Sequence, residues 1–239
     1  MVAFTMSGAQ NKIPSGCPSL DELLRGGYGK GEVTLIYGEA STGKTTAVIQ
    51  AATSAAKTGL KVLYVDSDHS FTQQRFHQIA GTESRLASEL IMLFLPETFT
   101  EQRALVESFE NYVTPSLGLV IVDSMSSLYR AAFSKAESIF TLNRDLSRQL
   151  AYLGELSASN RIACIITSQV HAKLSPPAGD VEPVARRALF HFPRAILRIR
   201  NTPRQSVKEF ALERIDGSDT RGSSRLVALT ESGLEDVRT

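Results

Sequence analysis

Cysteine is scarce in this chain, which argues against two kinds of stabilising site. The 239 residues include only Cys17 and Cys164. Neither belongs to a C-x-x-C pair or stands near a histidine cluster, so a metal site is not expected. Cys164 lies in the apolar run IACII and is expected to be a small buried side chain. Two cysteines favour a reducing compartment over a disulfide-stabilised secreted protein.

Long apolar runs and an excess of either charge are also missing. No run approaches the roughly 18 residues that a membrane-spanning helix needs. Residues 1–12 lack the charged and apolar segments of a signal peptide, so we expect a cytoplasmic protein without a membrane partner. The 26 Lys and Arg residues nearly balance 25 Asp and Glu residues, giving a formal net charge of +1. Any surface that binds nucleic acid must therefore be a local patch.

A glycine-rich loop gives the strongest positive signal. Residues 38–45 (GEASTGKT) fit the P-loop pattern G-x-x-x-x-G-K-[ST] at every required position. Residues 33–37 predict a buried strand before the loop, and residues 46–57 predict a helix after it. Backbone N–H groups and the helix dipole would then favour phosphate at the loop. A chance glycine-rich turn is the alternative, and the flanking strand and helix argue against it.

The pattern assigns roles to single residues. Lys44 would reach the β- and γ-phosphates of a nucleotide, and the Thr45 hydroxyl would bind Mg²⁺. The apolar run at 119–123 ends in Asp123, which would hold the same ion through water. A strand-end cap is the alternative role for Asp123. The residues expected to surround the nucleotide are Gly38, Glu39, Ala40, Ser41, Thr42, Gly43, Lys44, Thr45 and Thr46.

Three further residues are candidates for the same site. Asp68 follows an apolar run and could deprotonate a water molecule. Gln169 follows another run and could hydrogen-bond a γ-phosphate. With Lys44, these two are the candidate catalytic residues. Arg75 could stack on adenine, because guanidinium planes pack well on aromatic faces. The alternatives are a solvated loop acid for Asp68, an ordinary polar loop residue for Gln169 and a solvent-facing helix residue for Arg75.

The pattern of apolar runs predicts an α/β fold with a mostly parallel central sheet and helices on both faces. The helix expected over residues 136–157 has leucines at steps of three and four, as in an amphipathic crossover helix. Residues 171–183 predict a loop. Three later runs predict a C-terminal antiparallel β meander. The predicted strands are residues 61–66, 90–95, 117–123 and 161–167, followed by 194–200, 208–214 and 224–230.

The segment before the P-loop is too short for an independent domain. We expect residues 1–30 to form a lead-in with one capped helix and residues 31–239 to form a single domain. Ser19 and Glu22 have the spacing of a capping box. Leu20, Leu23 and Leu24 form an apolar stripe, and residues 26–27 (GG) should end the helix.

A local basic stretch is the candidate nucleic-acid contact. Residues 183–208 contain no acidic residue, and phenylalanines lie among their arginines. Arginine with interleaved aromatic residues suits phosphate contacts and base stacking. A solvated basic face or a protein interface is the alternative. The candidates taken from this stretch are Arg186, Arg187 and Arg194.

Several motifs, in this order, resemble those of the RecA/RadA recombinase family. Residues 15–27 (SGCPSLDELLRGG) are similar to its entry motif. Residues 122–130 (VDSMSSLYR) and 166–170 (ITSQV) are similar to the segments that open its two DNA-binding loops. Residues 229–234 (LTESGL) are similar to its closing motif. The resemblance covers about residues 13–237 and is greatest to the short archaeal members of the family.

The resemblance implies a RecA-like P-loop ATPase core that binds ATP, Mg²⁺ and DNA. It places Arg75 at the adenine-stacking position, Gln169 at the γ-phosphate sensor and Arg130 at a DNA contact of the first loop. Lys44, Thr45 and Asp123 match the nucleotide and metal positions. The implied role is in homologous recombination and DNA repair, as a mediator of the main RadA-type recombinase. Single-stranded or branched DNA and further copies of the chain are the other expected partners.

Two departures from the family pattern bear on activity. The family's catalytic glutamate is Asp68 here, so the carboxylate falls back by about 1.5 Å, and misplacement on the order of 1 Å can cost ~100-fold in rate. The family's Gly-Gly-His is Ala185-Arg186-Arg187 here. We therefore expect weak ATP hydrolysis, with or without DNA, and no strand exchange. The alternative function is a KaiC-like regulatory ATPase with no DNA role, which the near-neutral charge favours.

Overall fold

The computed structural model describes residues 11–134, 138–172, 181–183 and 185–237. Within them, one large sheet has the strand order β12-β11-β10-β9-β3-β7-β6-β4-β5, and β8 pairs with β7 beside this path. A two-stranded sheet joins β1 (Lys12–Ile13) to β2 (Tyr28–Gly29). The strands of the large sheet are β3 (Val33–Gly38), β4 (Lys61–Asp66), β5 (Ile91–Phe94), β6 (Leu117–Asp123), β7 (Ala163–Ala172), β8 (Val181–Pro183), β9 (Ala195–Asn201), β10 (Val207–Ile215), β11 (Ser218–Thr230) and β12 (Gly233–Asp236).

Six strands form the parallel part of the sheet, from β9 through β3, β7, β6 and β4 to β5. Every residue of β3 and of β6 is buried. This agrees with their continuous apolar sequences, because strands covered on both faces have no solvent side to fill with polar residues. The predicted α/β fold with a mostly parallel sheet is confirmed.

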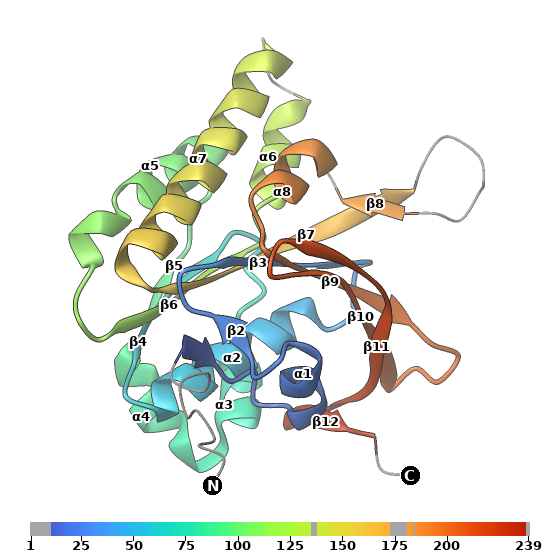
Figure 1. The fold of residues 1–239 in the computed structure, drawn as a ribbon. Coiled ribbons are helices and arrows are strands. Elements are labelled where there is room, and N and C mark those ends of the chain that lie inside the picture. Colours follow the sequence, from blue (N-terminus) through green and yellow to red (C-terminus); the bar gives the residue numbers. More distant parts are fainter. Residues whose placement is uncertain (1–10, 135–137, 173–180, 184, 238–239) are drawn as a thin grey trace, which may run out of the picture.

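Helices cover both faces of the sheet (Figure 1). One face carries α1 (Pro18–Leu23), α2 (Lys44–Lys57), α3 (Gln73–Ala80) and α4 (Ser84–Leu90). The other carries α5 (Phe99–Glu107), α6 (Ser127–Phe133), α7 (Ile139–Asn160) and α8 (Arg186–His191). Short 3-10 helices occupy Gly81–Glu83 and Phe109–Tyr112. None of the helices in the described ranges is long and apolar enough to cross a membrane.

The C-terminal strands form the predicted meander and extend it. β9 lies inside the sheet, parallel to β3, with Tyr37 opposite Arg198. β10, β11 and β12 then continue antiparallel to the edge. β11 spans 13 residues, and β12 is a fourth strand that was not predicted. β12 escaped prediction because its four residues, GLED, contain a single apolar side chain.

The predicted loop at 171–183 is wrong at both ends. β7 continues to Ala172, and Val181–Pro183 form β8, which pairs antiparallel with β7. Residues 173–180 lie outside the described part of the chain. The apolar run of β7 stops before its last residues, Gln169–Ala172, and the three residues of β8 contain no apolar run, so neither strand segment next to the Pro- and Gly-rich stretch had a strand signal of its own.

The lead-in helix α1 begins differently from the prediction. The first residue of the helix is Pro18, and its N-cap residue is Cys17, whose side chain makes no capping hydrogen bond. The predicted Ser19–Glu22 capping box is therefore wrong. The Ser19 amide donates instead to Asp236 Oδ1 at 2.9 Å. Glu22 pairs with Arg225 at 3.1 Å. Proline at the first helical position starts the helix two residues too early for Ser19 to act as the cap.

The apolar stripe and the helix stop of the lead-in are as predicted. Leu20, Leu23 and Leu24 are buried in the core that α2 shares. Gly27 has φ +117°, and a Cβ there would lie 2.3 Å from the carbonyl oxygen of Ile13. Glycine is therefore required where the chain turns from α1 toward β2, because the backbone of β1 passes too close for any side chain.

Candidate functional site

A cleft at the carboxyl-terminal edge of the parallel strands brings the predicted site residues together. Gly38 at the end of β3 lies opposite Gln169 of β7, and Asp66 at the end of β4 lies opposite Asp123 of β6. Parallel strands place their carboxyl ends at one edge, where α/β proteins bind ligands. The cleft has a volume of about 890 Å³ and is lined by Ala40, Ser41, Gly43, Lys44, Thr45, Thr46, Asp68, Ser70, Arg75, Asp123, Gln169, Leu229, Thr230 and Glu231.

The glycine-rich loop itself is shaped by residues behind this lining. A Cβ on Gly38 would lie 2.5 Å from the carbonyl oxygen of Ile199, so only glycine lets the loop leave β3 beside β9. The Thr42 hydroxyl donates to the Glu39 carbonyl at 2.9 Å. Gly43 has φ +96° and precedes α2, whose first turn has no side-chain cap. The amides of this first turn are therefore available to an anionic acceptor such as a phosphate oxygen.

Lys44 lies folded over the loop. Its Nζ donates to the carbonyls of Gly38 at 3.0 Å and Glu39 at 2.6 Å. Burial lowers the pKa of Lys44, and the negative charges of Asp123, Asp68 and Glu39 oppose that shift. A buried ammonium group that donates to neutral carbonyl oxygens is suited to gain an anionic partner, as phosphate would be.

Asp123 is a buried carboxylate surrounded by hydroxyl groups. Tyr64 donates to its Oδ2 at 3.1 Å, and Thr167 donates to its Oδ1. Thr45 and Asp123 line the same cleft, where the Thr45 hydroxyl lies 3.4 Å from Ser70 Oγ. Burial raises the pKa of Asp123, and hydrogen bonds from neighbouring hydroxyl groups act in the opposite direction. The structure thus brings the two predicted metal-binding side chains together.

The oxygen donors of Thr45 and Asp123 fit Mg²⁺ as part of a ligand set that phosphate and water would complete. Thr45 and Asp123 offer hard oxygen atoms, which this ion prefers. Within the described residues, no three His, Cys, Asp or Glu side chains cluster as metal ligands. An ion held here would need most of its ligands from phosphate oxygens and water, which is the usual way that nucleotide sites hold Mg²⁺.

Asp68 and Gln169 meet across the cleft. Gln169 Nε2 donates to Asp68 Oδ2 at 3.3 Å, and Asp68 is exposed. The loop that carries Asp68 is shaped by a residue that the sequence patterns did not indicate, Asp66. Asp66 is fully buried and accepts from the amides of Ser70 at 3.0 Å and Phe71 at 2.8 Å. Its position at the end of β4 was visible in the sequence, but nothing there distinguished it from Asp68.

Arg75 projects from α3 to the far end of the cleft. Its guanidinium donates to the carbonyls of Thr230 at 2.9 Å and Glu231 at 2.7 Å, and to Thr46 Oγ1 at 3.3 Å. The turn between β11 and β12 was therefore a missed part of the site. In the sequence, residues 229–234 of this turn indicate only the closing motif of the family and no role in the site.

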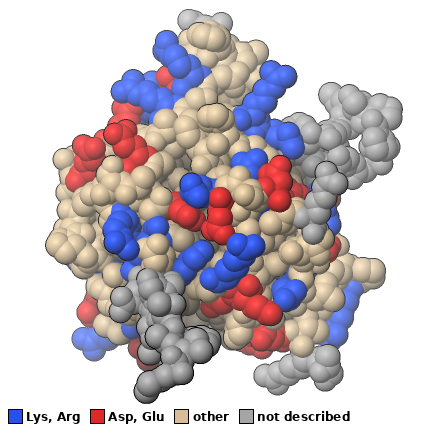
Figure 2. Space-filling view, in the orientation of Figure 1, with Lys and Arg blue, Asp and Glu red and all other residues tan. Residues whose placement is uncertain are grey.

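The DNA-binding candidates fall into two groups. Arg130 on α6 and Arg186 and Arg187 on α8 are exposed. Arg186 lies 4.5 Å over the ring of Phe190. Both α8 arginines line a hollow of about 580 Å³ beside α7. Figure 2 shows several Lys and Arg side chains over the end of the molecule formed by α6, α7 and α8, whereas charges of both signs are interspersed over the rest of this face.

Arg194 lies apart from this group. Its amide donates to the carbonyl of Val33, the first residue of β3, so it stands at the opposite edge of the sheet from the glycine-rich loop. Its guanidinium pairs with Glu32 at 3.3 Å and donates to the Asp216 carbonyl at 3.2 Å. The sequence placed Arg194 with Arg186 and Arg187 because strand direction cannot be read from a run of basic residues.

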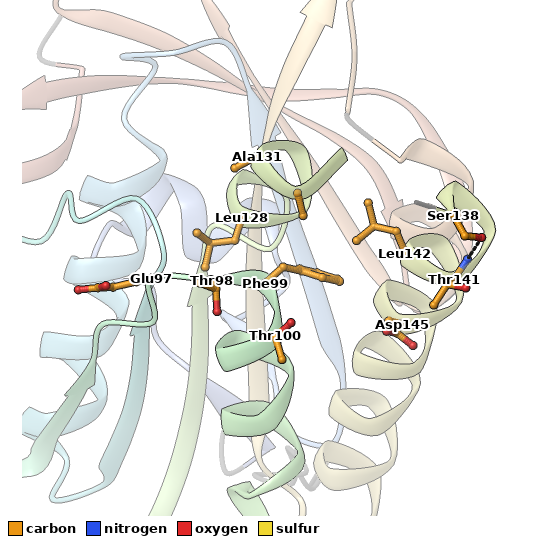
Figure 3. A pocket seen from close by; sticks show the side chains of 11 residues that line it. Glu97, Thr98, Phe99, Thr100, Leu128, Ala131, Ser138, Thr141, Leu142 and Asp145 are labelled. Atoms are coloured by element: carbon orange, nitrogen blue, oxygen red, sulfur yellow. Dashed lines mark hydrogen bonds between the residues drawn. The ribbon is translucent and has the colours of Figure 1, made fainter. Parts of the chain in front are cut away.

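A further hollow of about 560 Å³ lies between α5, α6 and α7 and was not predicted. Phe99, Leu128 and Leu142 project toward its interior from the three helices (Figure 3). Asp145 at its rim pairs with Arg103 at 2.7 Å. No local pattern in the sequence indicates this hollow, because its apolar residues have the spacing of ordinary core positions.

The glycine-rich loop between a buried central strand and a helix, with an aspartate at the end of β6, defines a P-loop α/β protein. The family model described as Rad51 matches residues 9–203, and the chain belongs to that family. The resemblance to RecA/RadA recombinases inferred from the motifs is thus confirmed. The chain is 35% identical over 228 residues to the DNA repair and recombination protein RadB of Thermococcus gammatolerans, covering 94% of this chain and 99% of that protein.

A second RadB protein and a solved structure agree with this assignment. The DNA repair and recombination protein RadB of Methanococcoides burtonii is 34% identical over 197 residues, or 82% of this chain and 86% of that protein. A crystal structure of the RadB recombinase superposes with a TM-score of 0.80 at 32% identity and covers 95% of this chain. The chain is therefore a RadB-type member of the family with a RecA-like fold.

Proposed function

We propose that the chain binds ATP with Mg²⁺ at the P-loop cleft and binds DNA at the α6–α8 end. In this proposal it acts in the cytoplasm in homologous recombination and repair, as a mediator of the main RadA-type recombinase. It hydrolyses ATP weakly and promotes no strand exchange itself. One observation above all supports the proposal: a single cleft is lined by candidate residues from separate segments of the chain, namely Lys44, Thr45, Asp68, Asp123 and Gln169.

Each side chain has a role that its surroundings support. The α2 amides and Lys44 bind phosphate oxygens, and Thr45 and Asp123 hold the metal, Asp123 through water. Bound MgATP supplies the phosphoanhydride bond and the metal charge. Gln169 senses the γ-phosphate. Its side-chain amide contacts Asp68, the residue proposed to activate water, and so lies on the γ-phosphate side of the cleft in this proposal. Arg75 stacks on the adenine ring.

Asp68 is the residue that sets the hydrolysis rate. Its carboxylate is exposed and, among the described residues, accepts one long hydrogen bond, of 3.3 Å, from Gln169. It can accept a proton from water, but its side chain is one methylene shorter than glutamate. We expect Asp68→Glu to raise steady-state ATP turnover about 10- to 100-fold, with Asp68→Asn as the matched control that abolishes it. Robust hydrolysis by the unaltered chain, stimulated by DNA, would contradict the weak-ATPase part.

DNA binding is tested by salt titration of the affinity for single-stranded and branched DNA. Each phosphate contact contributes a log–log slope of roughly −0.7 on single strands. Arg130→Ala and Arg187→Ala should each weaken binding and flatten the slope, while Arg194→Ala, an arginine held by Glu32 at the opposite sheet edge, should leave both unchanged. An effect of the Arg194 variant equal to the other two would refute the assigned surface.

The mediator role and the alternative are separated by a pull-down. Capture of the host's main recombinase by this chain, stronger with ATP than without, supports the proposal, and light scattering of the same samples reports self-association. The alternative is a KaiC-like regulatory ATPase without a DNA role. The mixed charge over most of the face in Figure 2 favours it. This alternative requires that the chain bind neither single-stranded nor branched DNA, even at low salt.

A further inference from the structure

The turn between β11 and β12 forms one wall of the P-loop cleft. Leu229, Thr230 and Glu231 line the cleft directly. Leu229 also lies against the glycine-rich loop, because a Cβ added to Gly43 would be 3.4 Å from Leu229 Cδ1. The wall therefore comes from a hairpin more than 180 residues after the loop that it completes.

This turn also sets the orientation of Arg75. Two nitrogens of the guanidinium donate to two successive carbonyls, those of Thr230 and Glu231, at 2.9 and 2.7 Å. Two fixed acceptors define the plane of a planar fork, so the guanidinium cannot rotate without losing a hydrogen bond. The third hydrogen bond of the guanidinium, to Thr46 Oγ1 on α2, is longer at 3.3 Å, so the two shorter bonds to the turn dominate the orientation of the flat face of Arg75.

Gln50 attaches the turn to α2. The Leu234 amide donates to Gln50 Oε1 at 2.6 Å, and Gln50 Nε2 donates to the Leu234 carbonyl at 3.0 Å. The second Nε2 hydrogen reaches the Gly16 carbonyl at 2.7 Å. The side-chain amide thus pairs with the backbone of β12 as a neighbouring strand would, and it is only 9% exposed.

Two glycines make room for this amide. A Cβ on Gly233 would lie 2.6 Å from Gln50 Oε1, and a Cβ on Gly16 would lie 2.9 Å from Gln50 Cγ. Both glycines have positive φ, +122° and +85°. The backbone on both sides therefore closes around Gln50 more tightly than residues with side chains would permit.

We propose that Gln50 is a positioning residue for the base side of the cleft. It fixes the β11–β12 turn, and through it the plane of Arg75, relative to the first turn of α2, which carries the phosphate-binding amides. The ligand it serves is a nucleoside triphosphate, whose flat base needs an oriented guanidinium face and whose phosphates do not. This inference rests on the proposed nucleotide function.

The test compares two Mg²⁺-bound probes by calorimetry, ATP and inorganic tripolyphosphate. Gln50→Met keeps the length of the side chain and removes its three hydrogen bonds. We expect this variant to bind ATP about 2- to 30-fold more weakly, the range of one guanidinium–ring stack, and to bind tripolyphosphate as the unaltered chain does. Gln74→Met, on an exposed residue beside Arg75, is the matched control and should change neither affinity.

A double-mutant cycle isolates the route through Arg75. In an Arg75→Ala background, Gln50→Met should have little further effect on ATP affinity, because the group that Gln50 positions is gone. Hydrogen exchange without ligand should show a faster Leu234 amide in Gln50→Met. Gln50→Glu is a second variant should the first not fold, since it keeps the acceptor for Leu234 N and loses both donors.

The outcomes separate this inference from the function on which it rests. Equal losses for both probes, unchanged ATP affinity, or additive effects in the cycle would each overturn the positioning role while leaving nucleotide binding intact. An unaltered chain that binds neither probe would refute the proposed function and this inference together.

Discussion

Asp66→Asn tests whether the buried carboxylate at the end of β4 builds the loop that carries Asp68. Asp66 is fully buried, and its two oxygens accept from the amides of Ser70 and Phe71 at 3.0 and 2.8 Å. Asparagine keeps one acceptor oxygen and turns an NH₂ group toward the second amide. One charge-assisted hydrogen bond is lost, and one part-buried N–H is left without a partner.

The magnitude follows from those two contacts. A hydrogen bond to a charged group contributes about 1.5–3 kcal/mol, and a buried unsatisfied donor costs a comparable amount. Because the two terms overlap, we expect a loss of about 2–4 kcal/mol in the free energy of unfolding. For a chain of this size, each kcal/mol lowers Tm by about 2–4 °C, so Tm should fall by roughly 4–16 °C.

The matched control is Asp68→Asn, the same change two residues away. Asp68 is exposed and makes one hydrogen bond of 3.3 Å, so its variant should stay within about 0.5 kcal/mol of the unaltered chain. Urea unfolding and thermal melts of both variants, without nucleotide, provide the measurement. Equal stabilities of the two variants would refute the assignment of the loop-building role to Asp66.

Three other outcomes are expected. Burial raises the pKa of Asp123, so the folded chain keeps this proton to higher pH than the unfolded chain does. The free energy of unfolding of the ligand-free protein therefore falls as pH rises from about 4 through the raised pKa. Asp123→Asn should remove that decrease and unfold at a higher temperature near pH 8; a difference in Tm that is the same at all pH values would contradict this. Gly154→Ala in α7 meets nothing within 4 Å and should stabilise by about 0.5–1 kcal/mol in urea unfolding. Gly118→Ala, whose Cβ would lie 2.6 Å from Leu60 Cδ1, should destabilise by about 1–3 kcal/mol, and two glycine variants of equal stability would show that the packing is misjudged.

The features that the sequence predicted well depend on local patterns. The glycine-rich loop was identifiable because its strand, turn and helix are contiguous, and Asp123 because a buried strand ends with it. The long helix α7 was visible from its leucine spacing, and its stripe Leu142, Leu146, Leu150, Leu153 and Leu156 is buried. These patterns are set by burial over neighbouring residues, which composition and periodicity report directly.

The features that it missed depend on partners distant in the sequence. Gln50 lies in the middle of a predicted helix, and its hydrogen-bond partner Leu234 is 184 residues away. The cap of the Ser19 amide is Asp236, whereas the local spacing pointed to a capping box with Glu22. Arg194 was grouped with Arg186 and Arg187 because a basic run does not reveal which end of a strand each residue occupies. Long-range polar contacts of this kind have no local signature.

The Asp236–Ser19 contact has a consequence for synthesis. The start of α1 is completed by a carboxylate that the ribosome adds 217 residues later. At a translation rate of about 5–20 residues per second, roughly 10–45 s pass between the synthesis of Ser19 and that of Asp236. During that interval Leu20 and Leu24, which end in the core, remain without the hairpin that covers them. The docking of α1 onto the β11–β12 hairpin is therefore one of the last steps that synthesis permits, although α1 is among the first elements to be made.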